Sequence, residues 1–291
     1  MRFLRYSAQG KTGIALTEAG RARGLLEDHP EYPGDLPQLV IEGAAALSAA
    51  AETLSRVGSP IDLDQITTLP PFPSPGKIIC VGLNYADHSA ESGFKVPDYP
   101  TLFARFSSGL VAHNAPIIRP RLSIQLDYEG ELAAVIGKSG RNIPLDRALE
   151  HVAGYSIFND GSVRDYQTKA PQWTVGKNFD GTGAFGPIFV TSDELPPGAK
   201  GLKLQTRLNG TVVQSASTDD MIFDVASLIS IISEAITLSA GDVLVTGTPA
   251  GVGLARKPQL WMKQGDVCEI EIEQIGILRN PILDEEAASA A

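Results

Sequence analysis

Short apolar runs recur along the chain from residue 77 onward, and many of them are bounded by Gly, Asn or Pro. Runs of this kind, rich in β-branched and aromatic residues, predict strands. They read KIICVGL, ELAAVIG, YSIFND, GPIFVTS, LKLQTRLNG, VVQSAS, DVLVTG and CEIEIEQIGIL. Residues 223–238 differ, because apolar positions recur there at three and four, which predicts a helix that Asp220 or Asp224 could cap. Since strands dominate and do not alternate regularly with helices, we expect a β-rich α+β fold rather than a doubly wound parallel sheet.

The first 70 residues form a separate pattern. Residues 1–16 predict two short strands joined by a turn that contains glycine, and the Ala-rich residues 36–57 have helical spacing. A proline-rich stretch follows, and proline is excluded from helix interiors and central strands. We therefore predict a small N-terminal domain, residues 1–70, and a main domain, residues 71–291.

Composition and charge exclude several classes of protein. The 291 residues are 43% hydrophobic and 20% charged, which is typical of a globular protein and excludes disorder over most of the chain. A net charge of −10 without a basic patch argues against nucleic acid or an anionic membrane as a partner. The sequence contains neither a window of about 18 apolar residues nor a signal-peptide core. Cys80 and Cys268 are too far apart for a disulfide framework, so we expect a cytoplasmic protein with a small-molecule partner.

Three carboxylates give the strongest chemical signal. Glu129 and Glu131 are two positions apart, so a strand would point both side chains to the same face. Asp160 ends the apolar run GYSIFND, where a charged side chain can face a pocket. Carboxylate oxygens are the ligands that Mg²⁺, Mn²⁺ and Ca²⁺ prefer, and three of them leave about half of an octahedral shell for water and substrate. The alternative is a solvated acidic edge strand.

Other polar residues lie near these carboxylates in the sequence. Arg164 and Gln167 follow Asp160 at i+4 and i+7, so they share its face if the chain turns helical there, or else lie on an exposed turn. Lys177 is a cation in a glycine-rich segment of an acidic protein, which makes it a candidate anchor for a substrate carboxylate or enolate. The segment LVTGTPAGVG predicts a tight loop that presents backbone N–H groups and the Thr248 hydroxyl.

His88 and Glu91 form a candidate pair for general-base catalysis. On a short helix their spacing of three would let the carboxylate orient the imidazole and raise its basicity. The other interpretation is a surface histidine beside a surface glutamate. Two nucleotide-binding motifs are excluded: residues 181–186 match GxGxxG but precede a strand instead of a helix, and no GK[ST] is present. Without GxSxG, a serine-hydrolase elbow is unsupported as well.

Six segments taken together resemble the fumarylacetoacetate hydrolase family. In the family's order, over roughly residues 75–275, they read CVGLNYADHSAESG, PTLFARFSSG, LDYEGELAAVIGK, GYSIFNDGSVRDYQ, WTVGKNFDGTGAFGP and DVLVTGTPAGVG. The resemblance implies a mixed β-sandwich roll, usually dimeric, with a smaller N-terminal part. It implies Mg²⁺ or Mn²⁺ at Glu129, Glu131 and Asp160, a lid pair at His88 and Glu91, an active-site Lys177, and substrate contacts at Arg164, Gln167 and Thr248. Arg105 stands where many members have lysine, so we expect a substrate contact with altered geometry there.

The activity that this resemblance implies is metal-dependent hydrolysis of carbon–carbon bonds in 1,3-dicarbonyl 2-oxo acids, such as acylpyruvates or fumarylpyruvate. His88, oriented by Glu91, would take a proton from the water that attacks the distal carbonyl, and Lys177 with the metal would stabilise the departing enolate. One alternative is decarboxylation, hydration or tautomerisation of a related acid, such as oxaloacetate or 2-oxohept-3-enedioate. An alternative of another class is a non-catalytic metal- or ligand-binding module.

Overall fold

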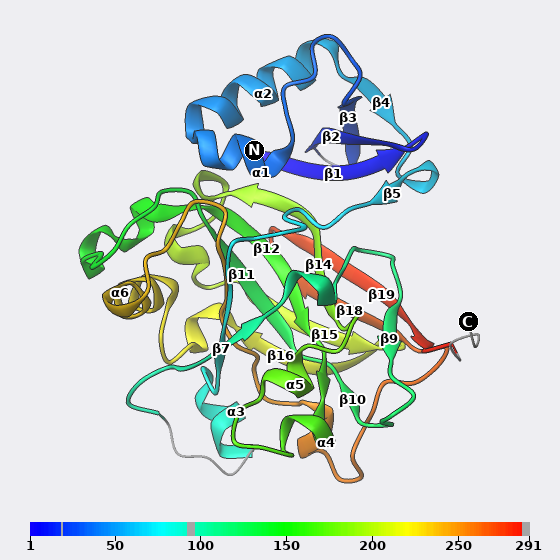
Figure 1. Ribbon diagram of the computed structural model, residues 1–291, viewed down its shortest axis with the longest axis vertical. Helices are drawn as coiled ribbons and strands as arrows, with labels where there is room; N and C mark the ends of the chain where they lie inside the picture. Colours follow the sequence, from blue (N-terminus) through cyan, green and yellow to red (C-terminus); the bar gives the residue numbers. More distant parts are fainter. Residues whose placement is uncertain (19, 92–96, 287–291) are drawn as a thin grey trace.

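The protein is described by a computed structural model that covers residues 1–18, 20–91 and 97–286. Within these ranges, a twelve-stranded sheet runs from the N-terminal strands into the middle of the molecule (Figure 1). Its main path is β4 (Ser59–Ile61), β3 (Arg21–Leu26), β2 (Lys11–Glu18), β1 (Arg2–Ala8), β14 (Gly183–Thr191), β12 (Val152–Asp160), β11 (Gly130–Ile136), β17 (Val243–Val245), β6 (Ile78–Gly82) and β7 (Thr101–Arg105). Two short strands lie off this path, β5 (Thr67–Thr68) beside β1 and β8 (Leu110–Val111) beside β14.

A second, five-stranded sheet packs against the main one. Its order is β16 (Thr211–Ser217), β15 (Lys203–Leu208), β18 (Val267–Ile272), β19 (Gly276–Asp284) and β9 (Ile117–Arg119). A separate pair joins β10 (Leu126–Asp127) to β13 (Ser162–Val163). The β-rich α+β fold predicted from the sequence is confirmed. The rejection of a dinucleotide site is also consistent with the structure, because Gly183 begins a strand rather than a helix.

The helices are few and short. They are α1 (Leu36–Glu42), α2 (Ala44–Val57), α3 (Ala86–Glu91), α4 (Arg164–Gln167), α5 (Thr174–Lys177) and α6 (Val225–Ala235), with 3₁₀ turns η1 (Leu63–Gln65), η2 (Ser107–Gly109), η3 (Leu145–His151), η4 (Ser192–Glu194), η5 (Pro197–Ala199), η6 (Thr218–Asp220) and η7 (Gly253–Ala255). Helix α6 is the one predicted over 223–238, and Asp224 is its cap, since its carboxylate accepts the Ser227 N–H. None of the described helices is long and apolar enough to cross a membrane.

The N-terminal segment continues the main sheet. Its predicted hairpin is confirmed as β1 and β2, and β1 pairs with β14, where Phe3 lies opposite Phe189. The predicted helix 36–57 is instead broken into α1 and α2, because Gly43 has a φ of 99°, in the left-handed region that glycine adopts without a Cβ clash. The division into two domains at residue 70 stays a prediction.

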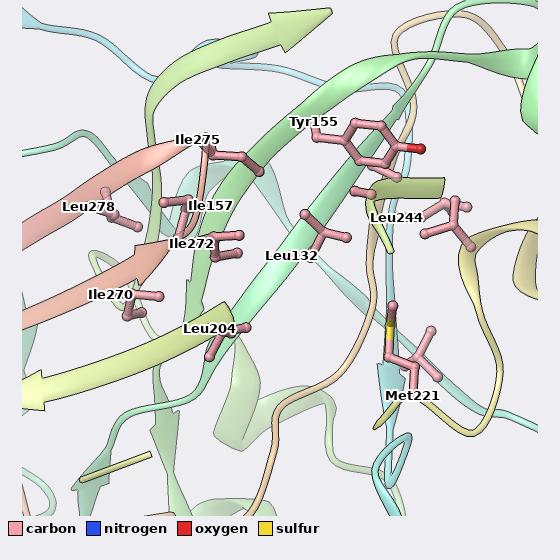
Figure 2. Packing of buried hydrophobic residues seen from close by; sticks show 14 of the residues in the cluster. Leu132, Tyr155, Ile157, Leu204, Met221, Leu244, Ile270, Ile272, Ile275 and Leu278 are labelled. Carbon is pink, nitrogen blue, oxygen red and sulfur yellow. The ribbon is translucent and has the colours of Figure 1, made fainter. Parts of the chain in front are cut away.

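Strand β11 lies at the centre of the fold and is buried on both faces. Because side chains alternate along a strand, Leu132 faces one hydrophobic core and Ala133 faces another. Figure 2 shows the first core, where Leu132 from β11 lies near side chains of the second sheet such as Leu204 and Ile272. Strand β11 is therefore held firmly in place, and residues at its beginning have little freedom to move.

The short helices α3, α4 and α5 gather at the end of the molecule opposite α1 and α2 (Figure 1).

His113 gives the fold a predicted sensitivity to acid. Burial, assisted by the nearby Arg279 charge, lowers the pKa of the imidazole from 6.5 to about 4, and its Nδ1 accepts the Arg279 backbone N–H at 3.0 Å. Because the folded-state pKa lies below the unfolded value, stability present above pH 6.5 is lost as the pH falls toward 4. We expect His113→Asn to reduce this loss by about 1–3 kcal/mol. Urea titrations at pH 7.5, 6 and 4.5 measure the free energy of unfolding of the wild type and the variant. An equal decrease of this free energy in both proteins as the pH falls would contradict the expectation.

Candidate active site

Three buried carboxylates meet where β11 begins and β12 ends. Glu129 immediately precedes β11, Glu131 lies within it, and Asp160 is the last residue of the antiparallel β12. The Asp160 N–H donates to the Glu129 carbonyl at 2.9 Å, which ties the two strand ends together. One oxygen from each carboxylate lies within 4.8 Å of the others, and all three residues are buried. The structure thus brings together the predicted metal ligands and excludes the solvated edge strand.

The electrostatics of this cluster favour a bound cation. Burial raises the pKa of Glu131 well above its ordinary value, and the charges of Asp160 and Glu129 raise it further. The Lys177 charge lowers this pKa in part, and so, to a smaller extent, does the Gly247 N–H, which donates to Glu131 Oε2 at 2.5 Å. A hard divalent cation between the carboxylates would remove both penalties, since it supplies charge and accepts oxygen ligands. The donor set therefore fits a divalent metal of the Mg²⁺ or Mn²⁺ type.

Lys177 is a positive charge that bridges two carboxylates of this cluster. It ends the short helix α5, and its Nζ lies 2.5 Å from Glu129 Oε2 and 2.6 Å from Asp160 Oδ2. Burial disfavours the charged ammonium, but the two carboxylates outweigh that effect and raise the pKa of the lysine. Its Nζ also lies 4.9 Å from the centre of the Phe103 ring. The sequence predicts Lys177 as a substrate anchor in a glycine-rich segment, whereas the structure places it at a helix end between two predicted metal ligands.

Arg164 forms a second cationic point in the site. It starts α4, and its Nη1 lies 2.6 Å from Glu129 Oε1 and 2.9 Å from Gln167 Oε1, while Nε donates to Asp127 Oδ2 at 2.8 Å. Arg164 and Gln167 thus share a face of one helical turn, as predicted, although Asp160 belongs to the preceding strand. Among the described residues, the buried Nη2 has no hydrogen-bond partner. The guanidinium therefore has one N–H group whose hydrogen-bonding capacity no described residue uses.

The glycine-rich loop after β17 presents its N–H groups, as predicted, but mainly to carboxylates of the protein. Gly247 donates to Glu131, and Gly251 donates to both oxygens of Glu91 at 2.9 and 3.0 Å. The Thr248 hydroxyl donates to the Gly130 carbonyl and accepts from Gln214 Nε2. This loop is consequently tied to β11 on one side and to α3 on the other.

A cavity of about 220 Å³ connects these groups. Its polar lining comes from Glu91, Glu129, Glu131, Arg164, Gln167, Thr168, Lys177 and Thr248, and its apolar lining includes Val81, Leu83, Trp173, Val252 and Leu254. Trp173 packs closely over Gly82, where a Cβ would come within 2.3 Å of the indole, and it meets Phe103 edge-on. The space suits a small, multiply charged molecule with one apolar side.

Arg105 lies behind Asp160 and is not among the residues that line the cavity. Its side chain is fully buried; Nη1 donates to Asp160 Oδ1 at 2.5 Å and Nη2 to Thr182 Oγ1 at 2.8 Å. Gly183 makes room for it, since a Cβ there would come within 2.8 Å of Nη2. Asp160 thus contacts Arg105 through Oδ1 and Lys177 through Oδ2. The sequence predicts that Arg105 contacts a substrate, whereas in the structure Arg105 does not line the cavity. The substrate contact stays a prediction.

The predicted lid pair is described only in part. Helix α3 contains both residues, which confirms the helical spacing, and Glu91 lines the cavity. The side chain of His88 lies outside the described residues, so the geometry of the pair stays a prediction. Among the residues of the site to which the sequence gives no role are Asp127, Trp173 and Gln214. Of these, only Asp127 carried a signal, because it begins the acidic segment Asp127–Glu131.

Comparison with known proteins agrees with this geometry. The family model of the fumarylacetoacetate (FAA) hydrolase C-terminal domain matches residues 77–283, which contain all of the site residues above. The chain belongs to the fumarylacetoacetate hydrolase family. A family member, the mitochondrial oxaloacetate tautomerase Fahd2a of Rattus norvegicus, is 41% identical over 270 residues, 91% of this chain and 86% of the relative. The human oxaloacetate tautomerase FAHD2A, also mitochondrial, is 37% identical over 289 residues, 97% of this chain and 92% of its own.

The fold is shared with a solved structure of the family as well. The fumarylacetoacetate hydrolase EaFAH of the psychrophile Exiguobacterium antarcticum superposes with a TM-score of 0.85 at 38% identity, covering 98% of this chain and 100% of that one. These three relatives therefore carry names of two reaction types, tautomerisation and hydrolysis. Membership of this family places the chain among enzymes. Which of the two reactions such a chain catalyses depends on the chemistry of its site.

Proposed function

We propose that this protein interconverts the keto and enol forms of a short 2-oxo dicarboxylic acid, with oxaloacetate as the first substrate to test. The observation that carries the proposal is the pair of cations in one small cavity: the Lys177 ammonium at the carboxylate cluster, and the Arg164 guanidinium with a donor to spare. The 41% and 37% identities to oxaloacetate tautomerases over most of the chain support the same reaction.

The two cations suit the two ends of such a substrate. The 2-oxo acid end would lie at Glu129, Glu131 and Asp160, where a bound divalent cation would act as a Lewis acid on the keto oxygen. Lys177 adds a fixed positive charge where negative charge develops on that oxygen during enolisation. The distal carboxylate would be held by Arg164, with Gln167 fixing the guanidinium plane.

Enolisation moves one proton from C3 of the acid to the oxygen on C2, and no bond to water forms or breaks. A group at the cavity wall must therefore accept and return a proton. We propose His88 and Glu91 on helix α3 for this step, because Glu91 lines the cavity and the two residues share that helix. The Gly251 N–H holds Glu91 at the wall, because both carboxylate oxygens of Glu91 accept from it.

The test starts from pure keto or pure enol oxaloacetate and follows their equilibration by NMR with Mg²⁺ or Mn²⁺ present. We expect the protein to accelerate equilibration and to exchange the C3 hydrogens with deuterated solvent, without releasing pyruvate faster than the buffer does. Equilibration at the buffer rate would contradict the tautomerase proposal. Addition of a strong chelator should abolish the acceleration, because the metal ligands are part of the site.

Hydrolysis of an acylpyruvate is the second candidate. It is favoured by the same Glu91 on the cavity wall, which with His88 could activate a water, and by the 38% identity to the hydrolase of Exiguobacterium antarcticum. Pyruvate release from acetylpyruvate and fumarylpyruvate, measured with lactate dehydrogenase, distinguishes the candidates. Release that is fast compared with oxaloacetate equilibration would favour the hydrolase.

His88→Ala should lower turnover of the accepted substrate by roughly 10²–10⁴, the usual effect of losing a general base. Substrate affinity should change less, because Lys177, Arg164 and the carboxylate cluster remain. Steady-state kinetics with His29→Asn as a control for loss of a distant histidine measure both quantities. If turnover stays within about threefold, His88 is not the base, and the proton must be carried by another group.

We also propose that the protein is a homodimer. Leu122 and Ile124 are 70% and 69% exposed on one loop, an apolar pair that a second copy could cover. Light scattering coupled to gel filtration measures the mass directly.

We propose that the protein is located in the cytoplasm. Its two free, buried cysteines suit that reducing compartment, whereas the two named tautomerases are mitochondrial.

A further inference from the structure

We infer that Asp127 is a positioning residue: its carboxylate fixes the Arg164 guanidinium and the cavity wall at Gly253 and Leu254 relative to each other, and so makes the site select acids with a distal carboxylate. The role given to Arg164 rests on the proposed function. The role of Asp127 rests on its own contacts, and nothing in the proposed chemistry uses it.

Asp127 is fully buried, and its two oxygens accept four hydrogen bonds. Oδ1 accepts the backbone N–H groups of Tyr128 at 2.9 Å and Gly253 at 2.8 Å. Oδ2 accepts the Leu254 N–H at 2.9 Å and Arg164 Nε at 2.8 Å. One side chain thus joins β10, α4 and the loop that follows β17.

The loop comes this close only because residue 253 is glycine. A Cβ at Gly253 would lie 2.7 Å from Asp127 Oδ1 and 1.8 Å from the Leu260 carbonyl oxygen. The neighbouring residues Val252 and Leu254 line the cavity, and Gly251 of the same loop binds Glu91 of α3. The position of this wall is therefore coupled, through Asp127, to the position of Arg164.

The remaining contacts of Arg164 show what this orientation achieves. With Nε held by Asp127 and Nη1 by Glu129 and Gln167, the guanidinium plane is fixed, and its buried Nη2 is left without a partner among the described residues. A fixed, partly unsatisfied guanidinium is a strong site for a second carboxylate, because little rotational freedom is lost on binding. Without Asp127 the guanidinium could turn, and this donor would no longer face one place.

Asp127→Asn is nearly isosteric but turns one acceptor oxygen into an NH₂ group. Because each oxygen of Asp127 faces two donors, either orientation of the amide places its NH₂ against two N–H groups. The matched control is Asp242→Asn. Asp242 is also buried and accepts the Ser239 N–H and the Lys77 ammonium, but it does not line the cavity.

The experiment compares two stable 2-hydroxy acids that differ only at the distal end, malate and 2-hydroxybutyrate. Calorimetric titration of the Mn²⁺-loaded protein measures their affinities. We expect the wild type and Asp242→Asn to prefer malate, and Asp127→Asn to lose at least about tenfold in malate affinity while 2-hydroxybutyrate and Mn²⁺ change less than threefold. Arg164→Met should cause the same selective loss, and Asp127→Asn should add nothing to it, because Asp127 acts through Arg164.

An equal loss for both acids would mean that Asp127 only supports the loop, and no loss would mean that it positions nothing; either result overturns the inference. If Asp127→Asn does not fold, Asp127→Glu keeps the charge while displacing it and should show the same selective loss. These titrations are independent of turnover. A protein that prefers malate in an Asp127-dependent way but does not equilibrate oxaloacetate would refute the proposed function and leave the inference standing.

Discussion

Glu131→Gln should bind a divalent cation more than about 100-fold more weakly than the wild type and should have no measurable activity. Glu131 is one of three carboxylates whose oxygens lie within 4.8 Å, and an amide supplies one neutral oxygen in place of a charged one. Calorimetric titration with Mg²⁺ and Mn²⁺ measures the affinity, and the oxaloacetate assay measures the activity. Glu234→Gln, an exposed glutamate on α6, is the matched control.

The same substitution should stabilise the metal-free protein at neutral pH. Burial and two neighbouring carboxylates raise the pKa of Glu131, so its folded-state pKa lies above its unfolded value. The contribution of Glu131 to the free energy of unfolding is then fully present at low pH, where the group is protonated. This contribution is lost as the pH rises through the folded-state pKa. The neutral amide avoids that loss, and the advantage of the variant should disappear near pH 4.5 and below. Full activity of the wild type in excess chelator would contradict this account of the cluster.

The fold was largely predictable because its strands are short, apolar and bounded by turn residues. After Glu131, residues 132–136 of strand β11 form an uninterrupted apolar run, since both faces of the strand are buried. The break at Gly43 was not predicted, because a single glycine inside a helical pattern is compatible with either an intact or an interrupted helix. Which strands pair was not predicted either. The pairing of β1 with β14 joins residues nearly 190 positions apart, and no local pattern encodes it.

The cluster of Glu129, Glu131 and Asp160 was predictable because two of these residues obey the two-residue period of a strand, and the third ends another strand. The partners of the cations were not. Lys177 and Arg164 were both assigned to substrate, yet each also contacts Glu129, and Arg105 contacts Asp160 from behind. Such contacts depend on how α4, α5 and β7 pack around the carboxylates. The contacts of Asp127 are not predictable for the same reason, since its four donors come from three separate segments.

Lys177→Met should lower turnover by about 10²–10³, the effect of removing one positive group from a developing oxyanion. Its ammonium is buried and bridges Glu129 and Asp160, so its loss removes a cation from both carboxylates, which keep their contacts with Arg164 and Arg105 respectively. In the absence of metal the variant should lose about 3–5 kcal/mol of stability. Methionine fills a similar volume beside Phe103, so packing alone should cost little.

The affinity for a metal distinguishes the effect of Lys177→Met from that of Glu131→Gln. Removal of a positive charge next to the cluster should leave the affinity for Mn²⁺ unchanged or increase it, because the carboxylates that would bind the metal all remain. Saturating Mn²⁺ should therefore restore much of the stability of Lys177→Met without restoring its activity, since a ligand that binds only the folded state stabilises it. For Glu131→Gln, saturating Mn²⁺ should neither increase the stability nor restore the activity. Thermal unfolding with and without Mn²⁺ provides the comparison. If Lys177→Met loses Mn²⁺ binding as severely as Glu131→Gln, then Lys177 orders the carboxylates for the metal, and the enolate-stabilising role proposed for it would have to be withdrawn.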